Sequence, residues 1–140
     1  MKSLKVALSV FFLILSSCAT IPKQPISPSD LADLKGKWAG TRDLRLDKEQ
    51  TKAYAEIEIF NDTLPLKGKV TIITYFTFSG VDTRIYPFEN GVINQQGNLA
   101  IKLTDEVALD LSLYGGKGKM KLQGSYYLRG NQGIIVLNKK

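Results

Sequence analysis

Apolar and polar residues alternate along most of the chain after Lys37, with a period of two. Such a period places successive side chains on opposite faces of a β-strand, so that one face is buried and the other meets water. One buried and one wet face is typical of antiparallel sheets. The apolar faces are Ala53, Ala55, Ile57 and Ile59; Val70, Ile72, Thr74, Phe76 and Phe78; Val107, Leu109, Leu111 and Leu113; and Met120, Leu122, Gly124, Tyr126 and Leu128.

Short turn-forming sequences such as Ser79-Gly80 and Gly115-Gly116 separate these stretches. A meander of many strands hides its edges best by curling closed. The pattern therefore predicts an all-β fold, a single antiparallel meander closing into a small barrel, with a two-sheet sandwich as the alternative. We expect about nine strands, at residues 37–46, 51–60, 66–78, 82–88, 91–95, 98–103, 106–114, 117–129 and 133–138. Pro87 indicates that strand 82–88 lies at a sheet edge or is interrupted there.

A short helix is expected just before the first strand. Ser27 can cap it, Pro28 suits its first turn, and the acidic Asp30 follows in that turn. Leu31 and Leu34 would share one face. We expect this helix to lie across one end of the domain.

The first 18 residues follow a different pattern. Lys2 and Lys5 precede an apolar run of ten residues, from Val6 to Leu15, interrupted only by Ser9. This is the anatomy of a secretory signal, and it is too short for a membrane-spanning helix, which needs about 20 residues. The segment ends in Leu15-Ser16-Ser17-Cys18, which resembles the lipobox of bacterial lipoprotein precursors.

This resemblance implies that the thiol of Cys18 receives diacylglycerol, that a peptidase cleaves before Cys18, and that a fatty acid such as palmitate acylates the new amine. Two or more acyl chains anchor a protein stably to a membrane. Ala19 in the next position favours the outer membrane. We therefore expect a lipid-anchored protein of the cell envelope, facing the periplasm or the cell surface.

The chain then divides into a signal peptide (residues 1–17), a lipidated cysteine with a proline-rich tether (18–28), and a barrel-like domain (29–140). Pro22, Pro25 and Pro28 recur at every third residue of the tether. Such spacing favours extended polyproline II structure, with a rise of about 3.1 Å per residue. A tether of this kind would hold the domain up to about 30 Å from the bilayer.

Composition narrows the chemistry. Removal of Lys2 and Lys5 leaves 17 basic and 13 acidic side chains, a net charge of +4 that is too small to indicate a nucleic-acid partner. The chain has no histidine and only one cysteine, which excludes the commonest general base and the usual zinc ligands. Glu56 and Glu58 lie about 7 Å apart on one strand face, which we expect to face water. We predict no catalytic residue, metal or cofactor.

The only tryptophan, Trp38, lies in Gly36-Lys37-Trp38, which resembles the G-x-W motif of lipocalins and related barrels. That resemblance implies that Trp38 closes one end of the barrel behind a short helix. It also implies that a basic side chain from late in the chain packs on the indole, a position that Arg129 matches.

These observations predict a lipoprotein with a structural or protein-interaction role, bound to the membrane through Cys18 and meeting an envelope protein partner. The alternative is a lipocalin-like carrier of an apolar small molecule or lipid. An interior filled by side chains, beside an exposed apolar patch, would favour the interaction role. A large dry cavity would favour the carrier.

Overall fold

The computed structural model describes residues 22–43, 50–116 and 118–140, so the signal peptide and Cys18 lie outside the described residues. The helical segment consists of a 3-10 turn, η1 (Pro28–Asp30), and one helical turn, α1 (Leu31–Leu34). The strands are β1 (Lys23–Gln24), β2 (Gly36–Asp43), β3 (Gln50–Ile59), β4 (Leu66–Phe76), β5 (Gly80–Ile93), β6 (Leu99–Lys102), β7 (Val107–Tyr114), β8 (Lys121–Leu128) and β9 (Asn131–Lys139).

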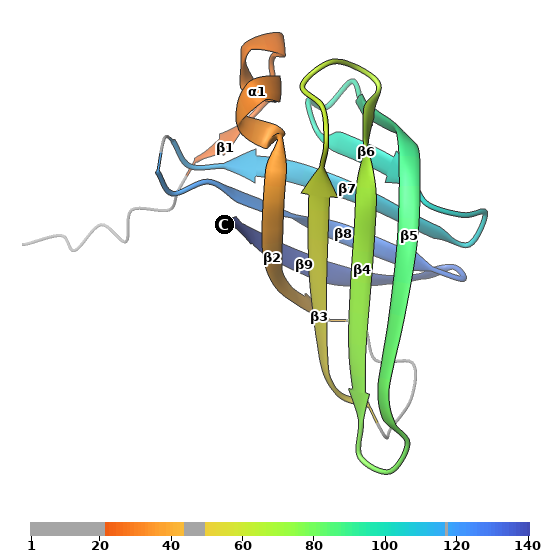
Figure 1. Ribbon diagram of the computed structural model, residues 1–140. Coiled ribbons are helices and arrows are strands. Elements are labelled where there is room, and N and C mark those ends of the chain that lie inside the picture. Colours follow the sequence, from red (N-terminus) through yellow and green to blue (C-terminus); the bar gives the residue numbers. More distant parts are fainter. Residues whose placement is uncertain (1–21, 44–49, 117) are drawn as a thin grey trace, which may run out of the picture.

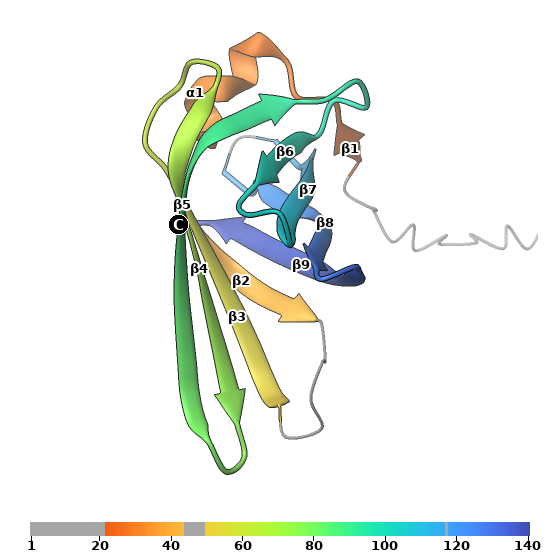
Figure 2. The ribbon, with the colours of Figure 1, turned by 90° about the vertical axis from the view of Figure 1, so that its right-hand side faces the viewer.

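Strands β2 to β9 form a closed antiparallel barrel of eight strands, and β1 is an additional strand on β7. The sheet order is β1-β7-β6-β5-β4-β3-β2-β9-β8, and pairing between β7 and β8 closes the ring. In Figure 1, β2 to β5 run vertically in front, and β7 to β9 run across behind them. The lower ends of β3 to β5 extend well beyond the rear layer (Figure 2). The predicted all-β meander and its closure into a barrel are confirmed.

Strand β5 differs from the expectation, because the two strands predicted at 82–88 and 91–95 are one continuous strand. Pro87 lies within it, opposite Lys69 of β4. On its other side, β5 pairs within the described chain only through Val92 and Ile93, with β6. A strand with one neighbour tolerates a residue that has no N–H. The edge expected at Pro87 is therefore present, and the interruption is not.

The core lies between the two layers and follows the alternation seen in the sequence. The predicted inward residues of β3 and β7 are buried. In and just before β8, Leu122 and Tyr126 are buried, whereas Met120, Gly124 and Leu128 are partly buried. Phe78 was expected on the buried face but is 84% exposed. Because β4 ends at Phe76, Phe78 falls in the turn that leads to β5. A methyl group on Gly124 would collide with the carbonyl oxygen of Asp110, so this glycine permits close strand approach rather than opening space.

The predicted helix is present and covers one end of the barrel (Figure 1). The backbone N–H of Ser27 donates to the Asp30 carboxylate at 2.8 Å, and the Ser27 hydroxyl donates to the same oxygen at 2.8 Å. Leu31 and Leu34 are buried beneath the helix. Gly36 follows with φ of 115°, a conformation that glycine adopts without strain.

Trp38 is fully buried at this closed end, and its indole N–H donates to the carbonyl of Leu34 at 2.8 Å. The cation on the indole is Lys139, whose ammonium lies 4.8 Å from the ring centre and also donates to the carbonyls of Asp33 and Lys35. The expectation that Arg129 packs on Trp38 is wrong. Arg129 belongs to the tight turn between β8 and β9, with φ of 50°, and that turn lies at the opposite end of the barrel.

Part of the predicted tether is docked on the barrel. Lys23 and Gln24 form β1 and pair with Tyr114 and Leu113 of β7. Ile26 is buried, and its N–H donates to the carbonyl of Gly97 at 2.9 Å. The stretch expected to be a spacer over residues 18–28 therefore becomes part of the folded domain from Lys23 onward.

Candidate functional site at the open end of the barrel

A cavity of about 200 Å³ lies at the end of the barrel opposite the helix. Trp38, Gly40 and Arg42 are alternate residues of β2 and point inward, so Arg42 lies about 13 Å along the strand from the closed end. Strands β4, β5 and β8 supply the other walls. The lining residues are Arg42, Ile72, Thr74, Phe76, Asp82, Arg84, Tyr86, Tyr126, Leu128 and Arg129. We call this cavity the mouth.

Arg42 is the unusual residue of the mouth, because its charged side chain is only 6% exposed. One terminal nitrogen, Nη2, donates to the hydroxyl of Thr74 at 2.9 Å. The guanidinium carbon lies 4.9 Å from the ring centre of Tyr126. The Nε–H is buried without an acceptor, and no carboxylate among the described residues forms an ion pair with Arg42.

The electrostatics of this position follow from its burial. Removal from water lowers the pKa of Arg42, and the neighbouring Tyr126 and Tyr86 oppose that shift. An arginine keeps its charge at neutral pH even so, because its ordinary pKa is far above 7. The mouth therefore holds a buried positive charge that no described acidic group neutralises.

The other two arginines of the mouth lie at its rim and are paired. Arg84 Nε is 2.9 Å from a carboxylate oxygen of Asp82. Hydrogen bonds to Tyr86 and to Asp82 raise the pKa of Arg84. Arg129 Nε is 3.0 Å from a carboxylate oxygen of Glu106. These exposed pairs contribute little to stability, but they leave Arg42 as the arginine of the mouth that has no acidic partner among the described residues.

Elsewhere in the described part of the barrel, large inward side chains occupy the interior. Leu109, Leu111, Leu122 and Tyr126 are all buried. Pockets for small molecules commonly measure about 300–1,000 Å³. The mouth is smaller than that range, so it can enclose only a compact ligand.

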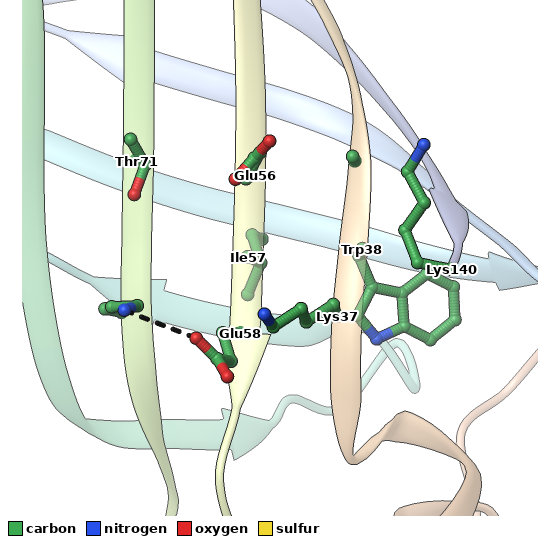
Figure 3. Close-up of a pocket in the computed structure, with 9 residues that line it drawn as sticks. Lys37, Trp38, Glu56, Ile57, Glu58, Thr71 and Lys140 are labelled. Atoms are coloured by element: carbon green, nitrogen blue, oxygen red, sulfur yellow. Dashed lines mark ion pairs between the residues drawn. The ribbon is translucent and has the colours of Figure 1, made fainter.

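Glu56 and Glu58 lie on the outer face of β3, over a shallow depression of about 190 Å³ (Figure 3). Glu58 forms an ion pair with Lys69 of β4 at 3.3 Å, drawn as a dashed line in Figure 3. Glu56 is exposed to solvent. Both residues face water as predicted, and no other Asp or Glu side chain is found among the described residues that line this depression.

A second feature is the outer side of the β4–β5 hairpin, which carries exposed apolar side chains. Ile85 is 62% exposed, and Val81 and Phe78, which lie successively nearer the tip of the hairpin, are also exposed. Tyr75 of β4 contacts Tyr54 of β3 edge to face, with ring centres 5.7 Å apart. The hairpin protrudes at the lower end of the molecule (Figure 1).

Sequence reasoning did not find Arg42. The sequence did contain a signal. Arg42 lies four residues after Trp38, and residues an even number of positions apart on a strand point to the same face, which is the inward face of β2 here. The amides near the turn at 94–98 also have partners that the sequence did not reveal. Asn94 and Asn98 donate to the two carboxylate oxygens of Asp110 at 3.1 and 2.7 Å, which stabilises that turn.

In the described parts of the chain, no group of three or more His, Cys, Asp or Glu side chains is placed to hold a metal ion. Among the helices of those same residues, none has the length and apolar character needed to cross a membrane. No protein-family model matches the chain, and no curated protein matches it.

Proposed function

We propose that the protein is a lipid-anchored lipoprotein of the bacterial cell envelope whose barrel binds an extended segment of another envelope protein, without catalysis. The anchor in this proposal is Cys18, on the strength of the lipobox-like sequence before it. The observation that carries the binding role is the free edge of β5, which adjoins an exposed apolar surface.

The edge offers main-chain binding. Over residues 80–91, β5 pairs with β4 alone among the described strands, so its second row of backbone N–H and C=O groups has no partner strand. An extended segment of a partner can add to such an edge as a further strand, and its side chains give specificity. Proteins often protect free edges with lysine, whereas the outward side chains here include Val81 and Ile85.

The edge can be tested by comparing Ile85 with Ile134. Both isoleucines face outward and are similarly exposed, at 62% and 54%, but Ile134 lies on β9, which has a strand on each side. A photo-crosslinking residue at position 85 should trap a discrete partner in the native cells, whereas the same residue at position 134 should trap none. Ile85→Lys, with the crosslinker at Val81, should abolish the product, and Ile134→Lys should not.

Amide hydrogen exchange gives a second measurement on the same edge. With the trapped partner purified, residues 80–89 of β5 should gain protection on binding, since their free backbone groups would become paired. Equal crosslinking at positions 85 and 134, or unchanged exchange along β5, would contradict the proposal.

A carrier is the second candidate, because the mouth opens to the outside and holds an unpaired charge. The filled interior supports the interaction role instead. A barrel that encloses an acyl chain should bind saturated fatty acids about fourfold more tightly for each added methylene, at about 0.8 kcal/mol each. We expect the affinity of the protein for saturated fatty acids to stay nearly constant as the acyl chain lengthens beyond the shortest acids. A steady rise from eight to sixteen carbons, in a titration of the folded domain, would favour the carrier.

A further inference from the structure

We propose that the mouth is a binding site for a small carboxylic acid with a compact apolar body, held by Arg42. This inference goes beyond protein binding at the β5 edge and does not depend on it. It rests on three observations: a buried arginine without an acidic partner among the described residues, a cavity that this arginine lines, and further lining residues that include apolar and aromatic side chains.

The unpaired charge indicates an anionic ligand. A buried guanidinium without a counter-charge is costly, and so is a buried N–H without an acceptor. In the mouth, Arg42 donates to the neutral hydroxyl of Thr74 and stacks on Tyr126, while its Nε–H has no acceptor. A carboxylate that enters the cavity supplies the missing counter-charge to the guanidinium, in the planar geometry that arginine and carboxylate groups share.

The remaining walls describe the rest of the ligand. Ile72, Phe76 and Leu128 give the cavity apolar sides, and Tyr86 and Tyr126 give it aromatic ones. A hydrophilic anion such as phosphate would leave these sides without matching contacts. A cavity of about 150 Å³ is known to hold benzene, so the 200 Å³ of the mouth suits a ring or short chain that bears one carboxylate.

The rim arginines provide a built-in contrast. Arg84 already has Asp82 and Arg129 already has Glu106, so neither needs an anion from outside. Arg42 differs from both in being buried. We therefore assign recognition of the carboxylate to Arg42, and we assign a minor role in attracting anions to the rim.

The test uses benzoate and its uncharged counterpart benzamide on the unaltered protein. Calorimetry should show benzoate binding at one equivalent, with benzamide about 100-fold weaker, the loss typical of leaving a buried charge without its partner. Nuclear magnetic resonance should show the Arg42 Nε–H signal moving on addition of benzoate. Equal affinity for the two compounds, or no saturable binding of benzoate, would overturn the proposal without requiring any variant to fold.

Two variants complete the experiment. Arg42→Met, which retains a long side chain but removes the charge, should weaken benzoate about 100-fold while leaving benzamide nearly unaffected. Arg84→Gln removes an exposed charge from the same rim and should change benzoate affinity by less than about threefold. Inorganic phosphate and hexanoate serve as further probes. Hexanoate should compete with benzoate, whereas a phosphate that binds more tightly than benzoate would show that the ligand class is wrong.

Discussion

Replacement of Trp38 by alanine should remove a large share of the stability of the domain. The indole is fully buried at the closed end, donates to the Leu34 carbonyl and carries the Lys139 ammonium on its face. Truncation of a large buried aromatic side chain costs about 3–5 kcal/mol. Since domains of this size are typically stable by only about 5–15 kcal/mol, the variant should fold but with a much smaller margin.

The assay is urea unfolding followed by far-ultraviolet circular dichroism, because the variant has no tryptophan to report by fluorescence. With an m-value of about 1.5–2 kcal/mol/M, the expected loss lowers the midpoint by about 1.5–3 M. Trp38→Phe keeps a ring in the core but removes the hydrogen bond to Leu34, so it should cost less, about 1–2 kcal/mol.

Phe78→Ala is the matched control, because that aromatic ring is 84% exposed at the hairpin tip and its loss should change stability by less than about 0.5 kcal/mol. Our account of the closed end fails if Trp38→Ala leaves the midpoint within the range of Phe78→Ala. It also fails if Trp38→Phe is as damaging as Trp38→Ala, since the ring itself would then contribute nothing.

Two further predictions concern the anchor and the mouth. Cys18→Ser should abolish incorporation of labelled fatty acid and leave an uncleaved precursor. If the wild-type protein itself takes up no labelled fatty acid, the proposed lipid anchor is wrong. Burial raises the pKa of Tyr126, with Arg42 opposing the shift, so its contribution to stability is complete below pH of about 10 and is lost as the pH rises through the folded pKa. Ultraviolet titration should show a tyrosine that ionises above the ordinary pKa of tyrosine, and Tyr126→Phe should remove that late step; its persistence in the variant would contradict the assignment.

The fold was predictable because each strand carries its own evidence of which face is buried. A period of two depends only on local geometry, and it correctly placed the buried residues of β3 and β7 and, in β8, Leu122 and Tyr126. The predicted total of nine strands equals the number of strands in the structure, but the two sets of strands are not the same. Two predicted strands merged at Pro87 into β5, and Lys23–Gln24 added a strand where a spacer was expected.

The features that the sequence did not reveal depend on long-range pairing. Lys139 reaches Trp38 because it lies at the end of β9 that meets the closed end of the barrel. Arg129 lies in the tight turn at the other end of β9 and so cannot reach the indole. The mouth is a similar case. Arg42 was placed correctly on a strand, but its burial requires β4, β5 and β8 to surround it. A charged residue on the inward face was the only local sign of the site.

The docking of β1 sets the distance between the barrel and any lipid on Cys18. Only residues 19–22 then separate that cysteine from Lys23, and a fully extended chain spans at most about 18 Å over those five Cα–Cα steps. Because β1 and the helix lie at the same end of the molecule in both views (Figures 1 and 2), so short a connection would draw that end toward the lipid head groups. In the proposed lipoprotein, the mouth and the β4–β5 hairpin would then point away from the bilayer, so a small acid or a partner segment would arrive from the aqueous side rather than by lateral diffusion through the lipid.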